Sequence, residues 1–174
     1  MGLQLIFCVE SNPKSQTDWI YIHETVRHYY SDINAAVRLT PIFLSGKNNY
    51  RSAKVTKSIS SYIKQYKAAS ADNRSVVIYA VDTDNFDSDP DDIAFFGEIQ
   101  RYCADNGYEF IWFCKDIEQV YIGKKVTDSK KTSEATTFKK KHKINDTIES
   151  KLKTASPKVN SSNILAVLDK WLKR

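Results

Sequence analysis

Glycine is scarce in this sequence, and its scarcity excludes the commonest nucleotide-binding loops. Five glycines occur in 174 residues, and none stands in a Gly-x-Gly-x-x-Gly or Walker arrangement. Cysteine is scarce too: Cys8, Cys103 and Cys114 are odd in number and too scattered for a redox or metal motif. We therefore expect a reduced, cytoplasmic protein without disulfides.

Long apolar runs are also lacking. No window approaches the roughly 18 consecutive apolar residues of a membrane span. The first residues, MGLQLIFCVES, have no basic segment and no small-residue cleavage site, so they predict a strand rather than a signal peptide. The 41% hydrophobic content is enough for a packed core, and the length fits one domain.

The charge is unevenly distributed along the chain. The net charge is +5, but residues 1–123 carry a net −4 and residues 124–174 a net +9. We therefore expect an acidic α/β domain over 1–123, followed over 124–174 by a Lys-rich segment and a C-terminal helix that packs on the same domain.

The first 123 residues alternate between strand and helix patterns. Short apolar runs predict strands at Gln4–Ser11, Val37–Gly46, Ser75–Val81 and Tyr108–Cys114. Helical periodicity predicts helices from about Asp18 to Asp32, over Ser52–Ala71 and over Asp91–Asp105. This order favours an α/β fold with a mostly parallel four-stranded sheet between helix layers, and Pro41 should confine its strand to a sheet margin or a bend.

The apolar signal weakens from Lys124 to about Asn160. This basic insertion is either a mobile loop or contains one polar helix near Thr136–Leu152. Its run KKKHK includes Lys139, Lys140, Lys141 and Lys143, which could neutralise nucleic-acid phosphates or simply be solvated. The last residues, SSNILAVLDKWLKR, return to helical spacing and predict a closing helix.

Six aspartates occur between Asp82 and Asp92 with no basic residue among them. Asp89, Asp91 and Asp92 are explained as cap and first-turn residues of a helix that starts with Pro90. Asp87 is interpreted as a turn residue. A calcium EF-hand does not fit, because positions 5, 6 and 12 of such a loop would be Phe86, Asp87 and Ile93.

Asp82 and Asp84 differ from the rest because they directly follow a buried strand. In a parallel sheet the carboxyl ends of the strands share one edge, where ligands bind. Glu10 ends the first strand, while Asp116 and Glu118 follow the last. If Asp82-Thr83-Asp84 remains extended, its two carboxylates point the same way. Such hard oxygen ligands predict a Mg²⁺ (or Mn²⁺) site.

The glutamate of FCVES and the Asp-x-Asp of AVDTD, in this β/α order, resemble the Toprim domain over about residues 3–123. The chain is most similar to small RloB-type proteins related to OLD nucleases, which are found in phage-defence loci. The resemblance implies that Glu10 is a general acid/base or metal ligand and that Asp82 and Asp84 hold Mg²⁺. It also implies a metal-ligand role for Glu118 in DIEQVYIG and relates VNSSNILAVLDKWL to the family's closing helix. Many Toprim proteins have glycine where this chain has Ser11.

The resemblance implies a Mg²⁺-dependent nuclease that hydrolyses phosphodiester bonds of DNA or RNA, with a role in phage defence. The alternative is a non-catalytic module of the same fold that binds nucleic acid or a partner protein of a defence system. A response-regulator domain, with Lys115 after the last strand, is a weaker third interpretation. No membrane partner is expected.

Other side chains carry weaker signals. His23 and His28 are five residues apart on one predicted helix, so they do not share a face well enough for a metal pair. Lys14 or Arg27 could contact a phosphate near Glu10.

Overall fold

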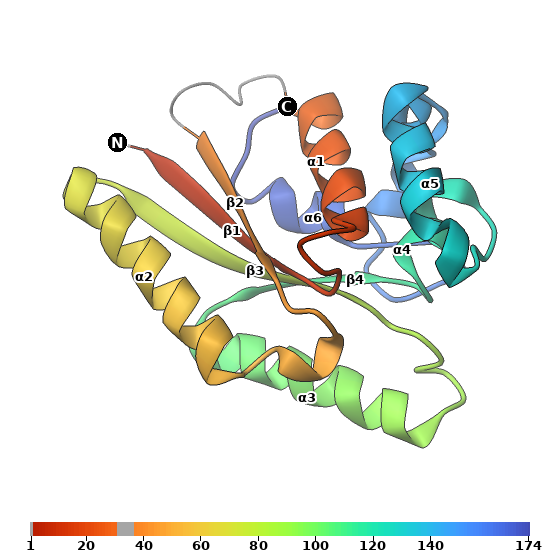
Figure 1. Ribbon diagram of the computed structural model, residues 1–174, viewed down its shortest axis with the longest axis horizontal. Coiled ribbons are helices and arrows are strands. Elements are labelled where there is room, and N and C mark those ends of the chain that lie inside the picture. Colours follow the sequence, from red (N-terminus) through yellow and green to blue (C-terminus); the bar gives the residue numbers. More distant parts are fainter. Residues whose placement is uncertain (1, 31–36) are drawn as a thin grey trace.

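Four strands form one parallel sheet in the computed structural model, which describes residues 2–30 and 37–174 (Figure 1). The strands are β1 (Leu3–Val9), β2 (Val37–Phe43), β3 (Arg74–Asp82) and β4 (Glu109–Phe113), and their order in the sheet is β2-β1-β3-β4. Every paired neighbour is parallel. The predicted α/β class with a four-stranded sheet is therefore confirmed.

Helices connect the strands and complete the chain. They are α1 (Thr17–Tyr29), α2 (Ala53–Ala69), α3 (Pro90–Asn106), α4 (Ile117–Ile122), α5 (Asp128–Lys140) and α6 (Ile164–Leu168), with 3₁₀ turns at Lys47–Asn49, Lys143–Asp146 and Glu149–Leu152. The predicted end of the first helix near Asp32 lies outside the described residues. Across the described ranges, no helix combines the length and apolarity that a membrane span requires.

The sheet is covered on both faces. Leu5 and Phe7 of β1 point into a core shared with α1, α4, α5 and α6. Ile6 and Cys8 point the other way, into a core shared with α2 and α3. Successive residues of a strand face opposite sides, so a strand that is apolar throughout, as β1 is, requires a helix layer on each face. Figure 1 shows these three layers.

The boundaries of α3 follow from its sequence. Asp89 is the N-cap, and its side chain accepts hydrogen bonds from the backbone N–H groups of Asp91 and Asp92. Pro90 begins the helix, where its missing N–H costs nothing. Gly107 ends it in the left-handed conformation (φ 66°), which glycine adopts without a steric penalty.

The basic segment contains a helix, but earlier than predicted. The predicted helix lay near Thr136–Leu152, whereas α5 spans Asp128–Lys140 and two 3₁₀ turns follow it. Only Ala135 and Phe138 of α5 are buried, so its apolar periodicity is too weak to locate its ends. Both residues belong to the same core as β1 and α1.

The closing helix is shorter than its periodicity predicted, because α6 covers only Ile164–Leu168. The residues before it run along β4. Asn163 accepts a hydrogen bond from the Trp112 N–H and donates one to the Phe110 carbonyl, while Ser162 donates to the Trp112 carbonyl. The outer side of β4 is therefore satisfied by this segment, through its side chains and through the backbone of Ser161 and Ser162, rather than by a fifth strand. At the other edge of the sheet, Pro41 lies in β2 as predicted.

The strand order places a change in chain direction between β1 and β3. The chain runs from β1 outward to β2 and then returns to the other side of β1 as β3. The connections after β1 and β3 therefore lead away from each other. This is the topological switch point at which α/β proteins bind ligands.

Candidate functional site at the carboxyl edge of the sheet

Glu10 and Asp82 meet at this switch point. Glu10 is the first residue after β1, and Asp82 is the last residue of β3. Oε1 of Glu10 accepts a hydrogen bond from the Asp82 N–H at 2.8 Å, and Oδ1 of Asp82 accepts one from the Ile117 N–H at 2.9 Å. Among the described residues, the second oxygen of each carboxylate takes no hydrogen bond. Each acid is thus oriented by the backbone while one oxygen remains available.

Two further acids adjoin this pair. Asp18, in the first turn of α1, accepts a hydrogen bond from the Ser11 N–H at 2.8 Å. Glu118, in the first turn of α4, is 1% exposed, and neither of its carboxylate oxygens has a hydrogen-bond partner in the described structure. The ammonium of Lys131, on α5, lies 3.4 Å from Glu118 Oε2. Four carboxylates from four segments are therefore gathered here. We call Glu10, Asp18, Asp82 and Glu118 the acid cluster.

Burial and mutual repulsion disfavour ionisation of the acid cluster. Burial, reinforced by the charge of Asp18, raises the pKa of Glu10 to about 8. Burial and the charge of Glu10 raise the pKa of Asp82 well above its ordinary value. Burial is also the largest cause of the raised pKa values of Asp18 and Glu118, which Lys131 partly offsets. A cation placed among these groups would relieve both penalties.

The sequence allows an extended Asp82-Thr83-Asp84, but the backbone is not extended at Asp84. The strand ends at Asp82, and Asp84 has a left-handed backbone (φ 48°) whose N–H donates to the Lys115 carbonyl. Its carboxylate pairs with Lys47, which also binds Asp92 at 2.7 Å. Partial burial opposes the charge of Lys47, but these two carboxylates raise its pKa above the ordinary value. Asp84 is thus held by a lysine rather than by its neighbour Asp82.

The donor atoms fit a hard divalent cation with few protein ligands. In the described ranges, no three His, Cys, Asp or Glu side chains are arranged as a complete metal site. Glu10 and Asp82 nevertheless each retain one oxygen, and Glu118 retains two. Magnesium is commonly held by one or two carboxylates together with waters and substrate phosphates. A site formed by the first pair would match that pattern.

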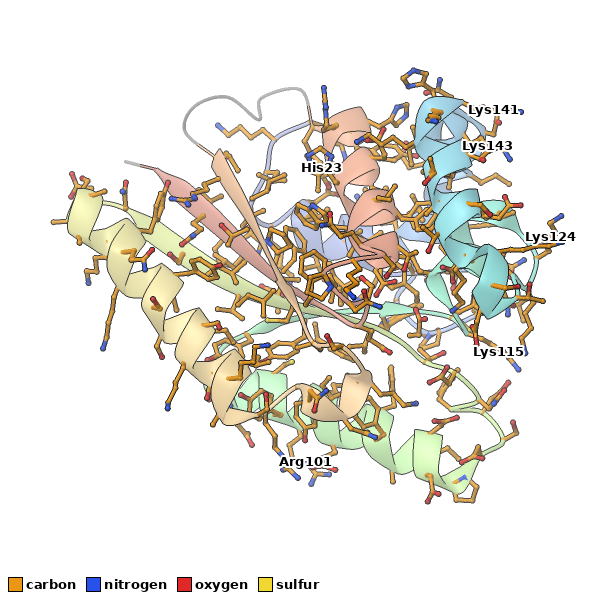
Figure 2. All side chains as sticks on the ribbon, viewed as in Figure 1. His23, Arg101, Lys115, Lys124, Lys141 and Lys143 are labelled. Atoms are coloured by element: carbon orange, nitrogen blue, oxygen red, sulfur yellow. The ribbon has the colours of Figure 1, made fainter. Side chains whose placement is uncertain are left out.

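The other predicted residues have structural explanations or lie elsewhere. Asp116 caps α4 by accepting from the Gln119 N–H at 2.7 Å. His23 packs against the Trp19 ring and lies 3.7 Å from Glu24. Lys139, Lys140, Lys141 and Lys143 form no hydrogen bond or ion pair with the acid cluster in the described structure; Figure 2 shows Lys141 and Lys143 near the upper end of α5. The basic residues and the acid cluster are thus separate features.

Three site residues were missed from the sequence. Asp18 had only the signal of a helix start, and Lys47 and Lys131 lie in polar segments without periodicity. Each reaches the site through tertiary packing: Lys47 from the turn after β2, and Lys131 from α5.

The fold and site together define a three-layer α/β protein with an acid cluster at the switch point of its parallel sheet. Comparison with known proteins adds no relative: no protein-family model, no curated protein and no solved structure matches the chain.

Proposed function

We propose that this protein is a Toprim-type, Mg²⁺-dependent nuclease that hydrolyses phosphodiester bonds in DNA or RNA and acts in phage defence. The observation that carries the proposal is the pairing of Glu10 and Asp82 at the β1–β3 switch point, each with one oxygen available. The raised pKa values of the acid cluster support it, because they mark a site that gains from a bound cation.

Glu10 and Asp82 would hold the metal, and Glu118 would contribute to a second position in place of its contact with Lys131. Mg²⁺ supplies Lewis-acid activation of the phosphate and of the attacking water in such sites. Mn²⁺ can replace Mg²⁺ because it has similar ligand preferences. Asp84 would join the ligands only after releasing Lys47. Glu10, whose pKa is raised toward neutrality, is also suited to proton transfer.

Lys47 and Lys131 would contact the substrate. Both ammonium groups lie beside site carboxylates, and a phosphate brings its own negative charge to the same place. Each lysine could therefore exchange a carboxylate for a phosphate oxygen without losing its charge partner. This exchange would explain how an acidic edge accepts a polyanion.

Substitution of the paired acids by their uncharged amides tests the proposal. Glu10→Gln and Asp82→Asn should each lower Mg²⁺- or Mn²⁺-dependent cleavage of labelled single- and double-stranded DNA and RNA by at least about 100-fold, because each removes a ligand charge from the metal. Asp91→Asn is the matched control, since Asp91 is an exposed first-turn residue. Cleavage rates that stay unchanged in both site variants would refute the nuclease assignment.

A second candidate is a non-catalytic module that binds nucleic acid or a partner protein in a defence complex. The Lys47–Asp84 ion pair favours it, because it occupies one of the proposed ligands, and so does Ser11 in place of glycine. This candidate predicts salt-sensitive nucleic-acid binding that survives Asp82→Asn and weakens when Lys139, Lys140, Lys141 and Lys143 are replaced by alanine. Either function is proposed to operate in the cytoplasm, in keeping with three buried, free cysteines.

A further inference from the structure

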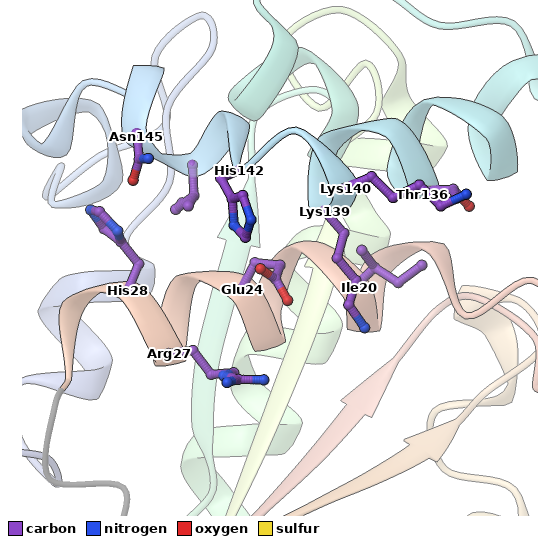
Figure 3. Close-up of a pocket in the computed structure, with 10 residues that line it drawn as sticks. Ile20, Glu24, Arg27, His28, Thr136, Lys139, Lys140, His142 and Asn145 are labelled. Carbon is purple, nitrogen blue, oxygen red and sulfur yellow. The ribbon is translucent and has the colours of Figure 1, made fainter.

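A second concave site lies between α1 and the C-terminal end of α5 together with the segment that follows it. It is a cavity of about 690 Å³, within the ~300–1,000 Å³ range of pockets that hold small molecules. Figure 3 shows His28 and Glu24 on α1 facing His142 and Lys139 on the opposite segment. We call this cavity the α1–α5 pocket. None of its lining residues belongs to the acid cluster.

The charged groups of the α1–α5 pocket are mostly cationic. Arg27, Lys139 and Lys140 line it, and Glu24 is its one carboxylate in the described structure. Arg27 and Lys139 both act to lower the pKa of His23, after the larger effect of burial, so their positive charges converge on the same part of α1. A pocket in which cationic side chains outnumber carboxylates is suited to an anionic ligand.

Like most lysines in the described ranges, these cations have no acid partner within 4.0 Å, whereas a minority of the lysines do. Lys47, Lys131, Lys153 and Lys170 each lie within 4.0 Å of a carboxylate. Across the described ranges, no such ion pair involves Arg27, Lys139 or Lys140. Three permanent charges are thus left for a ligand to neutralise, against the single charge of Glu24.

Two apolar side chains are part of the lining of the pocket. Ile20 and Ile144 line it, and Ile144 is buried in the main core. The imidazole rings of His28 and His142 stand at its sides. Apolar side chains and imidazole rings suit the flat face of a base, and the cationic side chains suit a phosphate. A simple inorganic anion would use the cationic side chains but leave the apolar side chains uncovered.

We propose that the α1–α5 pocket binds one nucleotide unit of a single-stranded nucleic acid, with the phosphate held by Arg27 and Lys139. This inference rests on the proposed nucleic-acid function and assigns it a strand-holding subsite. Arg27 is nine residues beyond Asp18 on α1, or about 13.5 Å along the helix axis. The proposed phosphate contact at Arg27 and the acid Asp18 of the acid cluster therefore lie on the same helix.

Binding measured without metal isolates the pocket from catalysis. The probe is a fluorescent single-stranded 12-mer, as DNA and as RNA, in EDTA. Arg27→Ala/Lys139→Ala should weaken binding about 10-fold or more and reduce the slope of log affinity against log salt by about one. Lys57→Ala/Lys64→Ala, which removes the same charge from the exposed face of α2, is the matched control and should change affinity less than twofold.

A charge-neutral variant separates a pocket from a general electrostatic surface. Asn145 lines the pocket and is exposed, so Asn145→Trp can fill the cavity without altering charge or core. It should weaken binding about 5-fold or more. If Asn145→Trp binds like the wild type while the Arg27/Lys139 variant binds weakly, the contact is a surface attraction and the pocket assignment is wrong.

Three further probes identify the source of the phosphate. Inorganic phosphate and a nucleoside 5′-monophosphate should compete with the 12-mer only at much higher concentration, because they lack the neighbouring nucleotides. Equal affinity for the free mononucleotide, or binding to phosphatidylserine vesicles without binding to the 12-mer, would overturn the proposal. The nuclease proposal fails separately, if 12-mer binding is normal but Glu10→Gln and Asp82→Asn leave cleavage unchanged.

Discussion

At the scale of single residues, Glu118 combines nearly complete burial with two unpartnered carboxylate oxygens. Lys131 provides the nearby positive charge at 3.4 Å. Partial burial acts to lower the pKa of Lys131, but Glu118 and Asp82 outweigh it and raise that pKa. Removing one member of such a pair is costly because the other charge remains in a poorly solvated place.

Lys131→Met should therefore destabilise the protein, by about 1–3 kcal/mol, measured by urea unfolding at pH 7 in EDTA. The cost is below that of a fully buried pair, because Lys131 is 29% exposed and Glu118 can take up a proton. Glu118→Gln in the same background should recover most of the loss. A double variant no more stable than Lys131→Met would contradict this account of the pair.

The parts of the site that could be predicted from sequence are those fixed by strand ends. Glu10 and Asp82 each follow an apolar strand, and parallel pairing alone brings them together. Asp84 could not be placed, because one left-handed residue after the strand redirects its side chain. Asp18 and Lys131 lie on helices, and the positions of these helices depend on packing across the whole core. Local sequence patterns do not show that packing.

At the scale of elements, strong apolar runs and cap residues identified the strands and α3. The run Ser75–Val81 is apolar on both faces, and it lies within the central strand β3. The polar α5 could be predicted only loosely, because two buried residues carry its attachment to the core. The length of α6 was overestimated, because apolar residues continue to pack after the helix has ended, as Leu172 does.

The contribution of the α3 N-cap to the free energy of unfolding can be measured directly. Asp89→Ala should lower the free energy of unfolding by about 1 kcal/mol, because the N–H groups of Asp91 and Asp92 lose their acceptor. Asp105→Ala is the control, since it removes an exposed acid from the last turn of the same helix, where the helix dipole does not favour it. Thermal unfolding should show a loss for the first variant only.

At the scale of the whole molecule, charged contacts attach the C-terminal segment to the rest of the protein. Asp169 accepts hydrogen bonds from the Tyr30 hydroxyl at 2.7 Å, from Lys153 at 2.6 Å and from Arg174 at 2.9 Å. Partial burial opposes ionisation of Asp169, but these donors outweigh it and lower its pKa to about 2. The segment after α5 is thereby connected to α1.

Asp169→Asn should reduce stability by roughly 1 kcal/mol at pH 7, a modest loss because the contacts are partly exposed and screened. The folded protein holds Asp169 ionised to a lower pH than the unfolded chain, so the stabilisation is complete above about pH 4 and declines as the pH falls toward 2. The difference between wild type and variant, from denaturant titrations, should therefore shrink over that interval. A difference that is constant from pH 7 to pH 2.5 would contradict it.

The two edge strands of the sheet are protected against pairing with another chain, and this affects self-association. An exposed strand offers a row of backbone groups on which a second chain can add a strand, and aggregation often starts there. Asn163 and Ser162 occupy that row along β4, and Pro41 interrupts the row in β2. The protein should therefore tolerate high concentrations without strand exchange, and replacing Asn163 with an apolar residue would expose β4 as a template for aggregation.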